Sequence, residues 1–249
     1  MFAYQAADDL LKDQIILVTG AGAGIGRAAA LAFAQSGATV ILSGRTTKKL
    51  EQVYDEIEAA DGAQPAIFPL NLEAAVSKDY DDLALAIEQE FGQLDGLLHN
   101  ASILGQRTPI EYYEPDSWHK VMQVNLHSAF LMTKSLIPVI RRATNGSIVF
   151  TSSSVGRQAR AYWGAYAVSK FATEGLMQLL ADELNGEDQQ IRVNSVNPGA
   201  VRTGMRATAY PAEDPETLAL PQDIMNIYLY LMGEDSLGVT GQAFDAQPK

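Results

Sequence analysis

Short apolar runs alternate along the chain with longer segments in which apolar residues recur every three or four positions. The short runs predict seven strands, at residues 15–20, 39–44, 66–72, 94–100, 146–152, 191–197 and 241–246. Because their apolar residues are continuous rather than alternating, these strands are typical of a parallel sheet that is covered on both faces.

The longer segments predict helices. The apolar face of the first helix is formed by Ile25, Ala28, Ala29, Ala32 and Phe33. Gly37 is placed to end this helix in a left-handed conformation. Further helices are predicted at about 50–57, before Gly62, and at about 79–91, 116–142, 164–185 and 221–232.

Strands and helices alternate regularly, with no internal repeat or low-complexity segment between them. This order predicts right-handed crossovers between parallel strands. We therefore predict the α/β fold class, with a single doubly wound Rossmann domain over residues 1–249. It would have a central seven-stranded parallel sheet with helices on both faces, and residues 1–13 would form an N-terminal extension.

Composition narrows the function. The chain of 249 residues is 47% hydrophobic and carries a net charge of −12, which repels nucleic acid and anionic membrane surfaces, so neither is an expected partner. The sequence has no cysteine, and His99, His119 and His127 lack metal-ligand spacing, so no metal site is expected. The N-terminus has acidic residues where a signal peptide needs positive charge, and no run approaches the roughly 20 apolar residues of a membrane span. We expect a cytoplasmic protein.

The octet TGAGAGIG occupies residues 19–26, between the first predicted strand and the first predicted helix. Gly20 and Gly24 permit a backbone geometry and a close approach that a side chain would block, and Gly26 lets the helix lie against the sheet. The helix N-terminus offers free amide groups and a partial positive charge to a pyrophosphate. A tight turn without a ligand is the alternative, but the strand, turn, helix and second strand favour a dinucleotide site.

Tyr166 and Lys170 are four residues apart in a predicted helix, so their side chains share one face. A neighbouring ammonium group favours the phenolate, so we expect Lys170 to draw the pKa of Tyr166 down toward the working pH. The phenol would then act as a general acid or base. Such a pair also occurs by chance in many helices. Here Ser153, thirteen residues before Tyr166, ends a predicted strand.

The glycine spacing T-G-x-x-x-G-x-G resembles that of the short-chain dehydrogenase/reductase family, and the resemblance covers nearly the whole chain. Further motifs follow in the order of that family: HNA at 99–101, Asn125, SSS at 152–154, Y-x-x-x-K at 166–170, NPG at 197–199 and Thr203. Within the family, IVFTSSSVGRQAR at 148–160 and FDAQP at 244–248 resemble a bacterial subgroup of poorly characterised YciK-type oxidoreductases.

The resemblance implies hydride transfer between a nicotinamide cofactor and a carbonyl or alcohol substrate. Ser153 would bind the substrate oxygen, Tyr166 would pass the proton, and Lys170 would hold the nicotinamide ribose. Asn125 would keep a water in a proton relay to Lys170. The two serines beside Ser153 compete for its role, and register favours Ser153.

The residues after the second predicted strand indicate which cofactor binds. By resemblance, NAD enzymes carry an aspartate where Gly44 stands, whereas Arg45 offers a guanidinium group to a 2′-phosphate. We therefore predict NADP(H) rather than NAD(H). Ala23 stands where many NADP-preferring relatives have a basic residue, which predicts a modest preference. The alternative is that Arg45 is an ordinary solvated residue.

Other cofactor contacts are implied by the resemblance alone. Asn71 and Leu72 stand where the family usually has Asp-Leu or Asp-Val near the adenine amine, and Asn71 keeps a carbonyl acceptor. Ser102 replaces a glycine of the family motif, which predicts a slightly altered turn. The expected cofactor-binding residues are Gly20, Ala23, Gly24, Ile25, Gly26, Arg45, Asn71, Leu72, Asn100, Ala101, Tyr166, Lys170, Pro198, Gly199, Val201 and Thr203.

The substrate is less defined. In this family the segment before the last long helix forms a lid, and residues 204–220 would form a short one that leaves room for a bulky or carrier-bound substrate. A loop without this meaning is the alternative. Four arginines flank the expected pocket, and they would either steer an anionic substrate or form surface or subunit ion pairs. They are Arg157, Arg160, Arg202 and Arg206.

The leading hypothesis is an NADP-preferring reductase of a small carbonyl compound. One alternative is a nicotinamide-bound redox sensor or scaffold with little turnover. Another is a sugar-nucleotide epimerase or dehydratase, although such chains usually carry a substantial C-terminal substrate domain. Helices 116–142 and 164–185 have apolar residues beyond one face, so a homodimer or homotetramer is expected.

Overall fold

Seven parallel strands form the central sheet of the protein, in the order β3-β2-β1-β4-β5-β6-β7. The computed structural model describes residues 1–186 and 191–247, so Pro248 of the FDAQP motif lies outside the described residues. The strands are β1 (Ile15–Thr19), β2 (Thr39–Gly44), β3 (Ala66–Pro69), β4 (Gly96–His99), β5 (Ser147–Thr151), β6 (Arg192–Asn197) and β7 (Ala243–Asp245). The predicted doubly wound α/β fold is confirmed.

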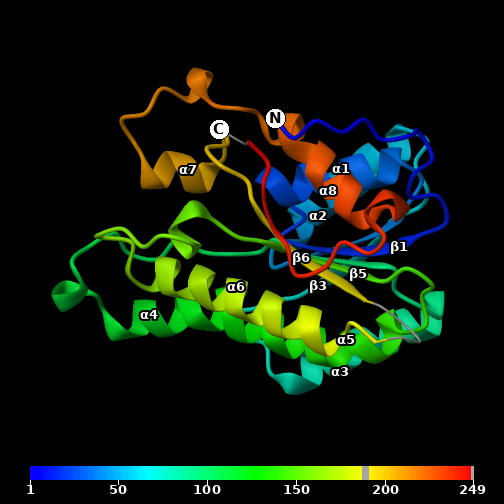
Figure 1. The fold of residues 1–249 in the computed structure, drawn as a ribbon, viewed down its shortest axis with the longest axis horizontal. Coiled ribbons are helices and arrows are strands. Elements are labelled where there is room, and N and C mark those ends of the chain that lie inside the picture. Colours follow the sequence, from blue (N-terminus) through cyan, green and yellow to red (C-terminus); the bar gives the residue numbers. More distant parts are fainter. Residues whose placement is uncertain (187–190, 248–249) are drawn as a thin grey trace.

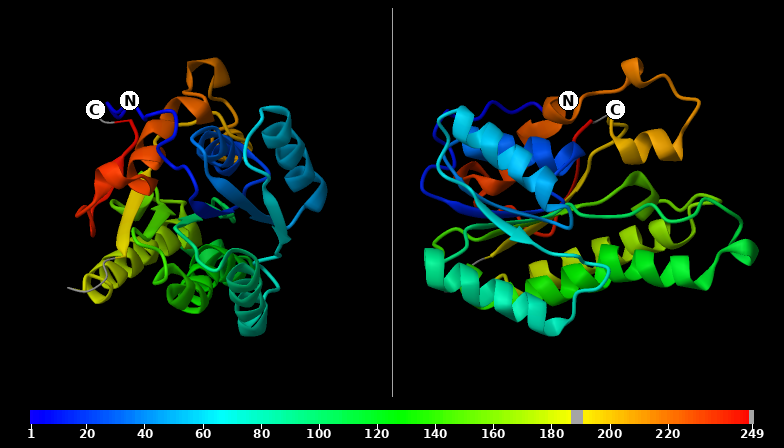
Figure 2. Two further views of the ribbon diagram at one scale, coloured as in Figure 1. Left: turned by 90° about the vertical axis from the view of Figure 1, so that its right-hand side faces the viewer. Right: turned by 180° about the vertical axis from the view of Figure 1, so that it is seen from behind.

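Helices cover both faces of this sheet (Figures 1 and 2). On one face lie α1 (Gly24–Gln35), α2 (Thr47–Ala59) and α8 (Met225–Met232), and on the other lie α3 (Ser77–Phe91), α4 (Pro115–Met122), α5 (Ser128–Ile140) and α6 (Gly164–Glu183). The short helix α7 (Gly204–Ala209) projects beyond the sheet, within the segment predicted to be a lid. Gly37 has a φ of 96°, as predicted for the residue that ends the first helix.

β2 has the predicted bounds, and the other strands are shorter than their apolar runs predict. β3 ends at Pro69, which pairs with Gly44, and the following Leu70 amide makes the last bond to β2 at 3.0 Å. β7 is the edge strand and keeps three residues, since Gly241 before it has a φ of 69°, outside the β region. The runs extend further because the chain on either side of a strand also contributes buried apolar residues, such as Leu70 and Leu94.

The predicted helix over 116–142 is wrong in one respect, because it is three elements. A π-helical turn, Gln123–His127, separates α4 from α5. The wider turn brings Asn125 inward, where its side chain binds the chain after β4. The predicted helix over 221–232 likewise begins as a 3-10 turn, Pro221–Ile224, before α8.

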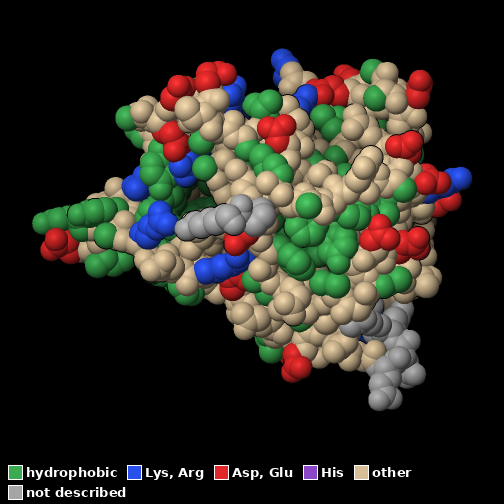
Figure 3. Space-filling model, turned by 45° about the horizontal axis from the view of Figure 1, so that its top comes forward, with side chains coloured by type: hydrophobic (Ala, Val, Ile, Leu, Met, Phe, Trp, Pro, Cys, Tyr) green, Lys and Arg blue, Asp and Glu red, His purple; other side chains and the backbone are tan. Residues whose placement is uncertain are grey.

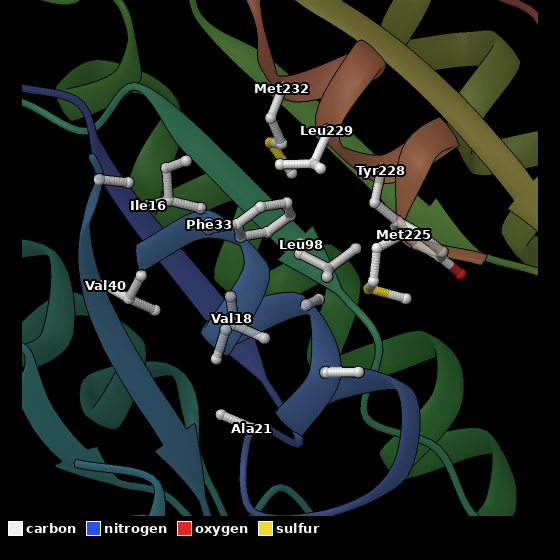
Figure 4. Close-up of a cluster of buried hydrophobic side chains, with 14 of the residues drawn as sticks. Ile16, Val18, Ala21, Phe33, Val40, Leu98, Met225, Tyr228, Leu229 and Met232 are labelled. Carbon is white, nitrogen blue, oxygen red and sulfur yellow. The ribbon is translucent and has the colours of Figure 1, made fainter. Parts of the chain in front are cut away.

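Two apolar clusters hold the layers together. The cluster between the sheet and α1, α2 and α8 contains Phe33, Leu98 and Tyr228, whose rings and methyl groups meet in Figure 4. The second cluster joins the opposite face to α3, α5 and α6, and includes Tyr80 and Phe150. Burying such side chains supplies most of the stabilisation that fixes the strand ends in place.

The predicted N-terminal extension is part of this packing. Leu11 is fully buried in the first cluster, and its amide donates to the carbonyl of Ser36 at 2.9 Å. The Phe2 amide donates to Ala246, beyond β7, at 2.9 Å, and the Tyr4 hydroxyl donates to Asp235 at 2.6 Å. The segment therefore ties the end of the chain to α8 and to the first helix.

Candidate active site

A cavity of about 460 Å³ opens over the carboxyl ends of the strands, where the strand order reverses between β1 and β4. Ligands of doubly wound sheets bind at this position. Nearly all of the expected cofactor residues line the cavity: Gly20, Ala23, Gly24, Ile25, Arg45, Asn71, Leu72, Asn100, Ala101, Tyr166, Lys170, Pro198, Gly199, Val201 and Thr203. Gly26 and the expected catalytic residue Asn125 are not among the lining residues: Gly26 packs against Gly20, and Asn125 bonds the amide of Ile103.

The glycine loop forms one end of the cavity. Gly20 and Gly24 have φ values of 68° and 56°, in the left-handed region that favours glycine. A β carbon on Gly26 would collide with the carbonyl oxygen of Gly20 and the carboxamide of Asn100, so the helix can approach the strand only without a side chain there. The first helical bond runs from Arg27 to Ala23 at 3.2 Å, which leaves the amides before it free for an anion.

Thr19 joins the ends of β1 and β4, a role that the sequence analysis missed. Its hydroxyl accepts from the amides of Asn100 and Ala101, at 2.9 and 3.1 Å, and donates to the carbonyl of Leu98 at 3.1 Å. The Asn100 carboxamide donates back to the Thr19 carbonyl at 3.2 Å. These bonds fix the turn in which Ser102 replaces glycine, and Ser102 lines the cavity.

Beyond β2, Arg45 is exposed and lines the cavity beside Thr46 and Lys49. Lys49 was also missed by the sequence analysis. The first turn of α2 lies directly against the glycine loop, because a β carbon on Gly22 would stand 2.9 Å from the β carbon of Lys49. The glycine loop has no basic residue at position 23, but Lys49 of α2 places one next to the loop. On the other side, Asn71 accepts from the Glu73 amide at 3.3 Å and lines the cavity.

The catalytic group predicted from the sequence comes together at the floor of the cavity. Tyr166 and Lys170 lie on α6, both buried, and Ser153 follows β5. Ser153 hydrogen-bonds the Tyr166 phenol and also caps a short turn by accepting from the Val155 amide at 3.5 Å. Lys170 Nζ donates to the carbonyl of Thr151 at 2.7 Å and lies 5.6 Å from the centre of the Tyr166 ring.

The neighbouring serines are placed differently from Ser153. Ser154 is exposed and is not among the residues that line the cavity. Ser152 lines the cavity and is buried, and within the described residues its hydroxyl has no hydrogen-bond partner. The hydrogen bond to Tyr166 thus favours Ser153, as register does.

The expected lowering of the pKa of Tyr166 by Lys170 is not observed in this structure. Burial raises the pKa of Tyr166 to about 12, and the hydrogen bond from Ser153 opposes that rise. Burial also lowers the pKa of Lys170 to about 8, against the charge of Glu174, which raises it. The ammonium group of Lys170 donates to the Thr151 carbonyl and lies beside the Tyr166 ring. Burial of the whole phenol is therefore the dominant effect on the pKa of Tyr166.

Asn125 acts on the loop after β4 and on α6. Its carboxamide oxygen accepts from the Ile103 amide at 2.8 Å, and its nitrogen donates to the Ile103 carbonyl and to Ser169, both at 3.0 Å. A small cavity of about 10 Å³ lies between Asn125, Lys170 and the buried His99. This space suits roughly one water molecule. The role of Asn125 in a relay to Lys170 stays a prediction.

The four arginines do not converge on the cavity. Arg157 pairs with Glu174 at 3.2 Å and Asp245 at 2.9 Å, and Arg202 pairs with Glu216 at 3.0 Å. Arg206 lines the cavity but is paired with Glu213 at 2.5 Å, and Arg160 is exposed. Figure 3 shows several basic side chains beside a hollow of this face, with acidic side chains on its other parts. Three of the four therefore form ion pairs within the chain.

Across residues 1–186 and 191–247, no group of three or more His, Asp or Glu side chains is arranged to hold a metal ion. None of the helices in these ranges is both long and apolar enough to cross a membrane.

Comparisons with known proteins agree with this geometry. The family model for short chain dehydrogenases matches residues 14–214. The uncharacterized oxidoreductase YciK of Escherichia coli K12 is 54% identical over 98% of this chain and 96% of its own length. A solved structure from Shigella flexneri complexed with NADP is 53% identical, with a TM-score of 0.94 over 97% of this chain and 100% of that one. One from Escherichia coli CFT073 complexed with NADPH is also 53% identical, with a TM-score of 0.94 over 98% and 100%. The protein therefore belongs to the short chain dehydrogenase family of oxidoreductases.

Proposed function

We propose that the protein uses NADP(H) to reduce a carbonyl compound or to oxidise the corresponding alcohol, with reduction as the working direction. The observation that carries this proposal is the meeting of Tyr166, Ser153 and Lys170 at the floor of the cavity that begins at the glycine loop. The relatives complexed with NADP and NADPH support the choice of cofactor.

The residues present fit such a cofactor. The free amides at the start of α1 would hold the pyrophosphate, and Arg45 and Lys49 would face the 2′-phosphate. Lys170 would hold the nicotinamide ribose, and Val201 and Thr203 would line the nicotinamide side. When bound, the cofactor supplies the hydride that is added to the carbonyl carbon.

The chain itself supplies the proton and the position of the substrate. Ser153 and Tyr166 would both donate to the carbonyl oxygen, which orients its carbon. Tyr166 then transfers its hydroxyl proton to that oxygen as the C–O double bond becomes a single bond. Because the pKa of Tyr166 is raised to about 12, the phenol holds this proton at neutral pH, which suits reduction.

A panel of carbonyl compounds with NADPH, run beside Tyr166→Phe, tests the proposal. The variant should lose turnover by roughly 100-fold or more while NADPH binds as before. Near-normal turnover would contradict the role of Tyr166. If NADPH binds but no carbonyl compound is reduced by the native protein, a redox sensor or scaffold becomes the better assignment.

We also propose that the protein assembles as a homodimer or homotetramer through α5 and α6. On α6, Val168, Phe171 and Leu179 are 44%, 43% and 54% exposed at helical spacing, and Phe130 on α5 is 50% exposed. Large apolar side chains gathered at one helical face usually mark an interface. The cytoplasm as its location stays a prediction.

A further inference from the structure

Two aromatic side chains form the wall of the cavity beyond the catalytic phenol. Trp163 lies 5.7 Å from the Tyr166 ring, centre to centre, and 5.9 Å from the ring of Tyr210 at the end of α7. Both rings line the cavity, together with Leu104 and Met205. A carbonyl carbon placed at Tyr166 would therefore have its neighbouring carbon atoms against aromatic and aliphatic surface.

The backbone around Trp163 is strained in a way that fixes this ring. Tyr162 has a φ of 71°, a conformation that is costly for a bulky residue, and Gly164 has a φ of 36°. A β carbon on Gly164 would collide with the ring of Tyr113, so the chain can turn into α6 only through glycine here. Trp163 is held between these two turns and is buried. The two positive φ angles therefore lie on either side of Trp163, whose own φ is −96°.

Arg107 holds the second ring from outside the cavity. Its guanidinium carbon lies 4.5 Å from the Trp163 ring and 5.1 Å from the Tyr210 ring, and its Nη1 donates to the carbonyl of Ala209. Arg107 is not among the residues that line the cavity. Cation–π contacts of this kind stabilise the pair of rings.

The cation that does line this end is already neutralised. Arg206 Nε donates to Glu213 at 2.6 Å and its Nη2 donates at 2.5 Å, while its guanidinium carbon lies 3.8 Å from the Tyr210 ring. Arg206 lowers the pKa of Glu213, so the carboxylate is ionised at neutral pH. An anionic substrate would have to displace Glu213 from its bidentate contact with Arg206.

We propose that the cavity selects neutral, apolar carbonyl compounds with a ring-shaped body, which packs against Trp163 and Tyr210, and discriminates against carbonyl compounds that carry a carboxylate. This inference rests on the proposed function and names its substrate class. Glu213 determines the specificity against anionic substrates. Trp163 determines the specificity for a ring-shaped substrate.

A matched pair of ligands tests the proposal by binding. The neutral ketone is 4-methylcyclohexanone, and its charged counterpart is 4-oxocyclohexanecarboxylate. The protein has two tryptophans, so Trp118→Phe leaves Trp163 as the sole indole fluorophore and Trp163→Phe leaves Trp118 as the control. With NADP present, the neutral ketone should change the Trp163 emission saturably, and the carboxylate should bind about tenfold more weakly or worse. The control variant should show little change.

Kinetics with three variants add the residue assignment. Trp163→Ala should raise the KM for 4-methylcyclohexanone about tenfold and that for acetone less than about twofold, and Trp163→Phe should restore most of the loss. Glu213→Gln should free Arg206 from its neutralising partner. The difference in KM between the two ring ketones should then shrink about tenfold.

The outcomes separate this inference from the proposed function. Equal or tighter binding of the carboxylate, or no saturable change with the neutral ketone, overturns the proposed selectivity even where carbonyl reduction is found. A Trp163→Ala variant that affects acetone and the ring ketone equally also overturns it. If no carbonyl compound is reduced, the proposed function fails, and the fluorescence titration still decides whether this wall binds neutral ring ketones.

Discussion

Arg45 and Lys49 offer two cations to one end of the cavity, and their removal tests the choice of cofactor. Both side chains line the cavity, and within the described residues neither forms an ion pair. They are thus available to a 2′-phosphate, which NADPH has and NADH lacks. We expect Arg45→Gln and Lys49→Gln to weaken the binding of NADPH and to leave the binding of NADH almost unchanged.

The magnitude follows from the exposure of the two residues. A hydrogen bond to a charged group contributes about 1.5–3 kcal/mol, and exposed groups fall at the low end because water screens them. About 1.5 kcal/mol corresponds to roughly a tenfold change in kcat/KM for NADPH. Arg45→Asp should move the NADPH to NADH ratio further, about 100-fold, because its carboxylate repels the phosphate and can accept from the 2′-hydroxyl of NADH.

The assay compares kcat/KM for NADPH and NADH at a fixed carbonyl concentration, and repeats the comparison as a Kd from cofactor fluorescence, which needs no turnover. Lys48→Gln is the matched control, since Lys48 is also exposed and does not line the cavity, and the substitution removes the same charge. An unchanged ratio in Arg45→Asp, or a change in Lys48→Gln as large as in Lys49→Gln, would refute the assignment.

Three further predictions concern the catalytic group and the assembly. Ser153→Ala should reduce turnover at least tenfold, since it removes a donor to the carbonyl oxygen. Ser152→Ala should reduce turnover less. The reverse order in steady-state rates would assign the role to Ser152. The rate of alcohol oxidation should rise about tenfold per pH unit from pH 6 to 8, because burial raises the pKa of Tyr166 to about 12 and oxidation needs the phenolate. The rate of reduction should stay nearly constant over this range. An oxidation rate that falls with rising pH would contradict this. Leu179→Glu should shift the light-scattering mass toward the monomer if α6 forms the subunit interface, and an exposed control such as Glu183→Gln should not.

Much of the fold could be predicted because the strands up to β5 are short apolar runs bounded by glycine or polar residues, although β6 mixes apolar and polar residues and β7 has only three residues. The order of strands and helices then leaves few topologies, and the sheet has the predicted number of strands, all parallel. The boundaries could not be predicted as well. Leu94 and Leu70 look like strand residues in the sequence, but they are buried just outside β4 and β3. The Leu70 amide still donates to the Gly44 carbonyl at the end of β2, at 3.0 Å.

The site residues that the sequence analysis missed are those that act through tertiary contacts. Lys49 has the spacing of an ordinary solvated helix residue, and its nearness to Gly22 arises from the packing of α2 on the glycine loop. The π-helical turn at Asn125 cannot be seen in QVNLH, because one extra residue in a turn hardly changes the apolar period. Glu174, the partner of Arg157, was also missed, because it is 17 residues away in sequence and their ion pair requires the docking of α6 beside β6.

The precision of the catalytic group depends on one strand end. β5 is buried along its whole length in the middle of the sheet, and the three residues at and after its end each reach the site. The Thr151 carbonyl holds Lys170 at 2.7 Å, Ser152 lies on the cavity wall, and Ser153 contacts Tyr166. Asn125 fixes α6 from the opposite side through Ser169, the residue before Lys170. Because both anchors act on the same turn of α6, a small shift of that helix would displace the phenol and the ammonium group together. The geometry of the proposed proton transfer would therefore depend on the end of β5 and on the turn at Asn125.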